Sequence, residues 1–273
     1  MSSFIHSTAL IDPKAHLGES VSVGPYAIVE AGVHIGEEST IEAFARIQGP
    51  TRMGARNHIH SHACIGGPPQ DMKYKGEDTV LEIGDDNTIR EYVTIHRGTK
   101  GGGGRTALGS GCLIMAYAHI AHDCILGDEV ILANAATLAG HVLVHNRAVI
   151  GGLSAVHQFV RIGESAYIGG MTGVSQDVPP YMLVAGERGW LQGLNVIGLR
   201  RQGVGREELT GLKKAYQLIW RSGLRREQAV QEVKDHLDLE SNASVTRLLD
   251  FLQSSSRGVI STKKEGTQEN SGS

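Results

Sequence analysis

Residues 17–47 read LGESVSVGPYAIVEAGVHIGEESTIEAFARI and place an aliphatic side chain at every sixth position. The same step of six runs from residue 5 to residue 65 without a miss. It resumes over residues 83–95 and then continues, shifted by one residue, over residues 108–174. A small residue follows most of the aliphatic positions four residues later. This regularity is the strongest structural signal in the chain, because chance would produce the first run only about once in a million trials.

A period of six fits neither an α-helix nor simple strand alternation, but it fits a short strand followed by a turn. Three such units close one triangular coil of about 18 residues, and the repeats found here make about nine coils. The pattern resembles the left-handed parallel β-helix of hexapeptide-repeat proteins, an exception to the usual right-handed crossover. A narrow prism also explains why the chain has 36 glycines and only 5% aromatic residues. We therefore predict a mainly β fold, a left-handed parallel β-helix with a C-terminal α-helical domain.

The composition narrows the classes of function. A net charge of −3 over 273 residues gives no sign of nucleic-acid binding. No basic-then-apolar segment opens the chain, and no apolar run is long enough for membrane insertion. Three cysteines without close pairs suit a reducing compartment, so a cytoplasmic location is expected. Cys112 and Cys124 each fall four residues after an aliphatic position and are predicted to be core residues.

The repeat and its interruptions predict the domain organisation. A β-helix domain should span residues 1–180, with loops at about 66–79 and 98–106, where the repeat breaks. Proline-containing DVPPY then ends the coils. Apolar residues at steps of three and four predict a helical domain over residues 181–260, with helices at 206–222, 224–238 and 244–255. The polar stretch 261–273 is predicted to be disordered.

Histidines concentrate in the middle coils. The group comprises His96, His119, His122, His141, His145 and His157. His122 and His141 are 19 residues apart, which is one coil plus one residue, so we expect them near the same edge. Two chemistries fit such a group: three histidines could hold zinc between subunits, as in γ-class carbonic anhydrases, or one could be a general base that activates a hydroxyl against a thioester. The second needs no metal or cofactor.

Six motifs, in order, resemble one family. They are GPPQDMKYKGE (67–77), VTIHRGT (93–99), AHIAHDC (118–124), NAATLAGH (134–141), AVHQF (155–159) and QDVPPY (176–181). Together they resemble the acyl-carrier-protein:UDP-N-acetylglucosamine O-acyltransferases, which carry out the first step of lipid A biosynthesis. The resemblance implies a homotrimer with active sites between subunits, and transfer of an (R)-3-hydroxyacyl group to the glucosamine 3-hydroxyl.

The resemblance also implies roles for particular residues. His122 matches the general base, and Gly140 matches the residue whose backbone N–H binds the oxyanion. Asp123 would assist His122, although neighbouring residues on a strand point in opposite directions. Gly170 matches the position that limits the length of the acyl chain, and glycine there favours a longer chain. The residues that match substrate contacts are Gln70, Asp71, Lys73, His96, His119, His141, His157, Gln158, Asn195 and Arg201.

The nucleotide end departs from the family pattern. Ile197 stands where an acidic residue would reach the ribose, and Gln202 stands where a second arginine would follow. A sugar nucleotide with a 3-amino group, used by some relatives, is therefore an alternative acceptor. Residues 200–234 hold nine Arg or Lys against four Glu, an excess of +5 that favours an acidic partner. Acyl carrier protein, which is strongly acidic, would be that partner.

Overall fold

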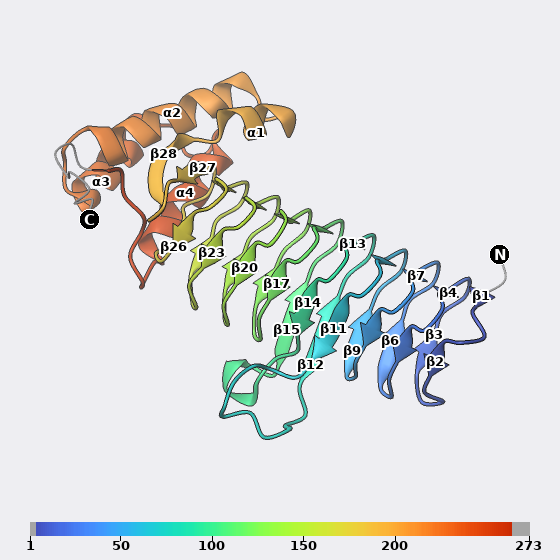
Figure 1. Ribbon diagram of the computed structural model, residues 1–273. Helices are drawn as coiled ribbons and strands as arrows, with labels where there is room; N and C mark the ends of the chain where they lie inside the picture. Colours follow the sequence, from blue (N-terminus) through green and yellow to red (C-terminus); the bar gives the residue numbers. More distant parts are fainter. Residues whose placement is uncertain (1–3, 264–273) are drawn as a thin grey trace, which may run out of the picture.

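A computed structural model describes residues 4–263, and the predicted tail beyond residue 263 lies outside the described residues. Short strands lie in three sheets of eleven, nine and eight strands, here called A, B and C, which wind as the faces of one long prism (Figure 1). Successive strands along the chain belong to successive sheets, and each coil pairs in parallel with the next. This confirms the predicted parallel β-helix.

The bounds of the strands follow the repeat. Sheet A contains β1 (Phe4–Ile5), β4 (Ser22–Val23), β7 (Thr40–Ile41), β10 (His58–Ile59), β13 (Thr88–Ile89), β16 (Leu113–Ile114), β19 (Ile131–Leu132), β22 (Val149–Ile150), β25 (Tyr167–Ile168), β27 (Met182–Ala185) and β28 (Trp190–Leu194). Sheet B contains β2 (Leu10–Ile11), β5 (Ile28–Val29), β8 (Arg46–Ile47), β11 (Cys64–Gly67), β14 (Thr94–His96), β17 (His119–Ile120), β20 (Thr137–Leu138), β23 (Ala155–Val156) and β26 (Gly173–Val174). Sheet C contains β3 (His16–Leu17), β6 (Val33–Ile35), β9 (Thr51–Met53), β12 (Val80–Ile83), β15 (Arg105–Leu108), β18 (Ile125–Leu126), β21 (Leu143–Val144) and β24 (Arg161–Ile162).

The aliphatic residue of each repeat points into the prism. Ile59, Ile89 and Ile114 pair with one another along sheet A, and all three are fully buried. Small residues such as Ala63 and Ala118 fill the corners between faces and are also fully buried. The core is thus a column of stacked aliphatic side chains, which gains the usual hydrophobic stabilisation without large aromatic residues.

Left-handed backbone at the corners gives the prism three distinct edges. Edge A–B, between sheets A and B, carries Tyr26, Phe44, His62, Tyr92 and Tyr117 at positive φ, and their rings stack on one another from coil to coil. Edge C–A carries mainly charged residues at the equivalent positions. Edge B–C carries Asp123, His141 and Phe159, with φ between 62° and 65°.

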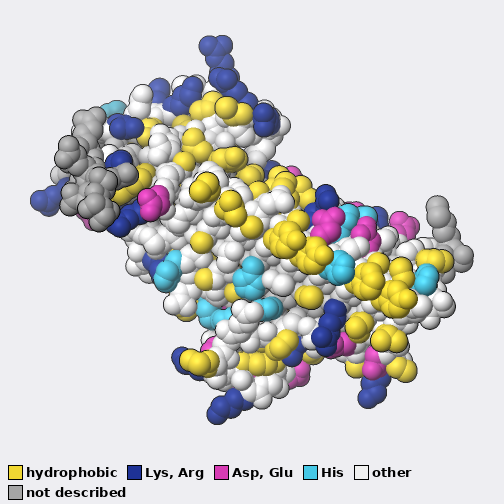
Figure 2. Space-filling model, in the orientation of Figure 1, with side chains coloured by type: hydrophobic (Ala, Val, Ile, Leu, Met, Phe, Trp, Pro, Cys, Tyr) yellow, Lys and Arg dark blue, Asp and Glu magenta, His cyan; other side chains and the backbone are white. Residues whose placement is uncertain are grey.

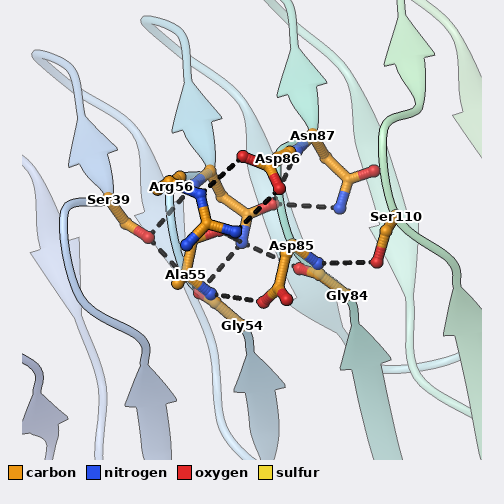
Figure 3. A network of polar contacts seen from close by, with 10 residues as sticks. Ser39, Gly54, Ala55, Arg56, Gly84, Asp85, Asp86, Asn87 and Ser110 are labelled. Carbon is orange, nitrogen blue, oxygen red and sulfur yellow. Dashed lines mark hydrogen bonds and ion pairs between the residues drawn. The ribbon is translucent and has the colours of Figure 1, made fainter.

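Side chains of one coil cap the corner N–H groups of the previous coil along edge C–A (Figure 3). Asp85 Oδ1 accepts a hydrogen bond from the Ala55 N–H at 2.7 Å, and Ser110 Oγ accepts one from the Asp85 N–H at 3.0 Å. Inside the same corner, the buried Asn57 Oδ1 accepts hydrogen bonds from both the N–H and the side-chain amide of Asn87. At these corners of edge C–A, side chains thus satisfy turn N–H groups that the strand ladder leaves unpaired.

Both interruptions of the repeat leave the prism at edge B–C. Residues 68–79 join β11 to β12, and residues 97–104, with the 3-10 turn η1 (Lys100–Gly102), join β14 to β15. The two loops project from the same side of the prism (Figure 1). The extra residues thus gather beside Asp123 and His141 rather than being spread around the prism.

Four helices cover the C-terminal end of the prism (Figure 1): α1 (Val196–Arg201), α2 (Arg206–Arg221), α3 (Arg226–His236) and α4 (Ala243–Gln253). The predicted boundary at residue 180 falls before two further strands, β27 and β28, which extend sheet A before the helices begin. Helix α1 was not predicted. Within residues 4–263, every helix is too short or too polar to cross a bilayer.

Candidate active site

His122 and Asp123 form a hydrogen-bonded pair at edge B–C. His122 Nδ1 lies 2.7 Å from Asp123 Oδ2, and the Asp123 side chain is fully buried. Strand β17 ends at Ile120, so both residues belong to the corner, where Asp123 has φ of 62°. Strand alternation, which would turn the two side chains apart, does not apply there. With its Nδ1–H donated to the carboxylate, the His122 ring keeps the lone pair of Nε2 free to accept a proton.

The glycine-rich loop holds the Asp123 carboxylate in place. Thr99 donates to it twice, from its N–H to Oδ1 and from its hydroxyl to Oδ2, each at 2.7 Å. Thr106 Oγ1 accepts a hydrogen bond from the Asp123 N–H at 2.7 Å. A Cβ at Gly102 would overlap the carboxylate. The repeat did not predict the contact between Thr99 and Asp123, because the 24 residues that separate them include the loop between two neighbouring coils.

Gly140 lies directly against the His122 ring. A Cβ at this position would stand 2.7 Å from His122 Cε1 and 2.9 Å from Nε2, so any larger residue would displace the ring. The Gly140 carbonyl accepts a hydrogen bond from Phe159, whereas its N–H has no acceptor among residues 4–263. A free N–H beside an imidazole nitrogen is an arrangement that could bind an oxyanion.

Three further predicted histidines adjoin this pair. His141 meets the His122 ring edge-on, with centroids 5.2 Å apart, and stacks on Phe159 at 4.4 Å. His119 Nδ1 is 2.7 Å from the Thr94 hydroxyl, and its ring meets that of His96 at 5.0 Å. Figure 2 shows histidine side chains gathered on this part of the surface, beside the projecting loop.

The His96 and His119 side chains are held neutral. Burial, with the nearby His119, His122 and Arg97, lowers the pKa of His96 to about 4. Burial and His122 also lower the pKa of His119. His96 Nδ1 is buried and has no hydrogen-bond partner among the described residues, so it is a polar atom that a bound molecule could satisfy.

His157 and Gln158 are exposed on the next corner along the prism. Arg257 Nη2 donates to His157 Nδ1 at 2.8 Å, and Arg257 also binds the carbonyl of Ser175. The segment after α4 therefore folds back across the last coils, a contact between residues 100 positions apart that the sequence does not indicate. His145, in contrast, faces Phe251 of α4 and lies apart from the His122 group.

Gln70, Asp71 and Lys73 lie on the projecting loop. Gln70 and Lys73 are exposed, and Asp71 accepts a hydrogen bond from the Lys73 N–H, which forms a tight turn. Arg97 fastens the loop to the prism through the Tyr74 hydroxyl and through carbonyls at the ends of β8 and β11. Among the described residues, none of these three side chains is hydrogen-bonded to the histidines of its own chain.

The residues predicted at the nucleotide end lie on α1. Asn195 caps this helix by accepting from the Gly198 N–H, and its amide donates to the Ser165 carbonyl, so both ends of the amide are engaged. Gln202 accepts from the Ser165 hydroxyl at 2.6 Å. Ile197 and Arg201 are exposed, one turn apart on the same helix.

Gly170 lies on edge A–B, away from His122. A Cβ there would stand 3.2 Å from the Gly152 carbonyl oxygen, and Leu153 and Met171 expose apolar side chains at the same edge. The predicted base and the predicted chain-length residue thus occupy different edges of one prism.

Cys112 and Cys124 are core residues, as predicted, whereas Cys64 is exposed. Burial raises the pKa of the Cys124 thiol to about 12 and that of Cys112 to about 11. Cys124 donates to the Ala139 carbonyl inside the prism. Ligand atoms of His122, Asp123 and His141 lie within 4.8 Å of one another, but only two of these residues are histidines, and Thr99 already donates to both Asp123 oxygens.

Comparisons with known proteins agree on one family. Residues 177–260 match the second domain of the UDP-N-acetylglucosamine O-acyltransferases, and residues 105–140 match the bacterial transferase hexapeptide repeats. The acyl-[acyl-carrier-protein]–UDP-N-acetylglucosamine O-acyltransferase of Anaeromyxobacter dehalogenans is 50% identical over 255 residues, which cover 93% of this chain and 98% of that protein. The enzyme of the same name from Halorhodospira halophila is 49% identical over 256 residues, covering 94% and 98%.

The solved structures agree with the sequences. LpxA from Acinetobacter baumannii superposes with a TM-score of 0.91 at 42% identity, covering 94% of this chain and 99% of that one. This likeness confirms the left-handed hand of the β-helix and supports acyl transfer rather than the zinc-enzyme alternative. The chain therefore belongs to the acyl-[acyl-carrier-protein]–UDP-N-acetylglucosamine O-acyltransferase family.

Proposed function

We propose that this chain transfers an (R)-3-hydroxyacyl group from acyl carrier protein to the 3-hydroxyl of UDP-N-acetylglucosamine, the first step of lipid A biosynthesis. The observation that carries the proposal is the His122–Asp123 pair with the free Gly140 N–H beside it. A thioester is reactive enough for direct attack, so a base and an oxyanion donor meet the chemical need.

The geometry supports one mechanism. His122 Nε2 takes the proton of the sugar hydroxyl while its oxygen attacks the thioester carbonyl, and Asp123 stabilises the resulting imidazolium. The Gly140 N–H binds the negative oxygen of the tetrahedral intermediate. The carbon–sulfur bond then breaks, and the imidazolium returns the proton to the departing thiolate. The products are the 3-O-acyl sugar nucleotide and the free carrier thiol.

The substrate-binding roles belong to the same proposal. Neutral His96 and His119 offer hydrogen bonds to an uncharged sugar without the cost of burying a cation. Gln70, Asp71 and Lys73 would reach the sugar from the projecting loop, and His141, His157 and Gln158 would line the remaining cleft. Ile197 offers no hydrogen bond to a ribose, so Arg201 is the exposed polar residue of α1 best placed for the nucleotide.

A homotrimer is part of this proposal. Gly170 and His122 flank sheet B from opposite edges, so they can border one acyl groove only when two chains are present. Sheet B presents small outward residues in its later coils, Thr137, Ala155 and Gly173, which would allow close packing of neighbouring prisms. In such a trimer, loop 68–79 of one chain would lie toward the cleft of another chain.

The helical domain is the proposed dock for acyl carrier protein. Arg200, Arg206 and Lys213 line one groove between α1 and α2, within the segment that carries an excess of +5. Such a basic groove would steer an acidic carrier toward the prism and would do so less well at high salt. We place the reaction in the cytoplasm because three cysteines without close pairs suit a reducing compartment.

The test of the proposed function is mass spectrometry of products. Purified protein is incubated with UDP-N-acetylglucosamine and with (R)-3-hydroxyacyl carrier proteins of several chain lengths. We expect one acyl group on the 3-oxygen and the release of free carrier thiol, with weaker use of a 3-amino acceptor. Absence of product at every chain length, or preferential use of the 3-amino sugar, would contradict the proposal.

Substitution of Gly170 by methionine should shorten the preferred acyl chain. The new side chain would lie at the edge that carries Leu153 and Met171, with its Cβ 3.2 Å from the Gly152 carbonyl oxygen. We expect kcat/KM for the longest accepted donor, relative to a donor shorter by a few methylenes, to fall by about tenfold or more. Competition between the two donors measures this ratio. Gly205→Ala, which places a methyl group in open space before α2, is the control and should leave the ratio unchanged.

A further inference from the structure

A second group of metal-ligating side chains lies on sheet A, away from the His122 edge. Glu42 follows β7, His58 belongs to β10, and His60 follows β10, so the three come from two neighbouring coils. Strands β7 and β10 pair directly, with His58 opposite Thr40. All three side chains are partly exposed on the outside of the prism. Spacings of 16 and 18 residues bring them together because one coil takes about that many residues.

Their ligand atoms converge on one oxygen. Glu42 Oε1 is 2.8 Å from His58 Nε2 and 3.2 Å from His60 Nδ1. The three ligand atoms all lie within 4.8 Å of one another. Ligand atoms around a tetrahedral zinc ion stand about 3.3 Å apart, given bonds of about 2.0–2.1 Å. The observed separations approach that value without any movement of the backbone.

The surroundings hold these atoms in place. Ser61 donates to Glu42 Oε2 from both its N–H and its hydroxyl, at 3.1 and 3.0 Å, which fixes the carboxylate and leaves Oε1 toward the histidines. The rings of His58 and His60 stack with centroids 4.0 Å apart.

Glu91 approaches the group without joining it. Its Oε1 lies 3.7 Å from His60 Nδ1, but Arg90 binds both Glu91 oxygens, from Nε and Nη2, each at 3.0 Å. Three protein ligands therefore remain, with one side open. Figure 2 shows histidine and acidic side chains in contact along this part of the prism surface.

We propose that Glu42, His58 and His60 form a surface site for a divalent transition-metal ion of the zinc class, separate from the acyl-transfer site. Two imidazoles and one carboxylate suit zinc, nickel or copper rather than calcium or magnesium. The bound ion would link two coils and would leave a coordination position for water. This site does not rest on the proposed acyl transfer, because no atom of the His122 group takes part in it.

Zinc binding by the full-length, chelator-treated protein tests the site. A competition titration against a chromophoric chelator measures stoichiometry and affinity in wild type, in His58→Ala/His60→Ala, and in His16→Ala/His34→Ala. The last is a control that removes another stacked histidine pair: the rings of His16 and His34 stack at 4.5 Å, across neighbouring coils, but neither is ion-paired in residues 4–263. His122→Ala separates the new site from the cluster at the acyl-transfer edge.

We expect one zinc ion to bind this site in wild type, in the control variant and in His122→Ala. The affinity should fall at least 100-fold in His58→Ala/His60→Ala, and Glu42→Gln should weaken binding about tenfold or more. Zinc should also raise the Tm of wild type and of the control variant but not that of His58→Ala/His60→Ala. Equal binding by His58→Ala/His60→Ala, loss of the only bound ion in His122→Ala, or no binding at micromolar zinc would overturn the proposal. Acyl transfer, assayed in parallel, should be the same with and without chelator.

Discussion

Replacing His122 by alanine should lower kcat for acyl transfer by a factor of about 10²–10⁴, the range that a positioned general base contributes. The His122 imidazole lies against Gly140 and is oriented by a hydrogen bond to a buried carboxylate. Its removal leaves the sugar hydroxyl to attack as a neutral alcohol. Steady-state kinetics with acyl carrier protein as the donor measure the loss.

The fold should survive this substitution, because His122 lies at a corner and not among the inward aliphatic residues. Thermal unfolding and light scattering should show an unchanged Tm and an unchanged oligomer. His34→Ala, which removes an exposed histidine on sheet C, should retain near wild-type kcat. A His122→Ala enzyme that keeps more than one tenth of wild-type kcat would refute the assigned role.

Gly102→Ala should lower kcat by about 10²-fold, the usual cost of misplacing a catalytic group by about 1 Å. Its methyl group would overlap the Asp123 carboxylate, so the carboxylate or the loop must move, and His122 would lose its orienting partner. Because Asp123 acts through His122, KM for UDP-N-acetylglucosamine should change much less than kcat. Initial rates at varied acceptor concentration separate the two parameters.

Gly101→Ala is the matched control for this effect. Gly101 and Gly102 are neighbours in the same 3-10 turn, but a Cβ at Gly101 meets no atom within 4 Å. The Gly101→Ala substitution should therefore change kcat and the stability of the protein little. If both variants lose activity equally, the loop matters through its flexibility and not through contact with Asp123.

The sequence predicts the prism well because its main determinant is local. One inward aliphatic residue in each strand and one small residue at each corner suffice to define the faces, and Ile59, Ala63 and Cys124 lie where the repeat puts them. The repeat also predicts which residues of different coils become neighbours. The spacing of 19 residues predicts that His122 and His141 lie near the same edge, and their ring centroids are 5.2 Å apart.

The sequence predicts the corners less well. The alternation rule for strands suggests that His122 and Asp123 diverge, whereas left-handed backbone at Asp123 turns them together. The role of Thr99 was hidden because a loop of arbitrary length separates it from the next coil. The return of Arg257 to His157 spans 100 residues and follows no repeat. Contacts made by irregular backbone are those that periodicity does not encode.

The regular coil restricts which changes in chain length the β-helix can accommodate. Deletion of one residue within a coil would move every later aliphatic side chain off the inward face, so only whole coils can be gained or lost there. The loops after β11 and after β14 are not subject to this restriction, and the second loop contains the one-residue shift of the repeat. Both open at the edge that carries Asp123 and His141. Insertions and deletions are therefore tolerated at the place where they can reshape the acceptor cleft, and a new substrate preference could arise there without a change to the core.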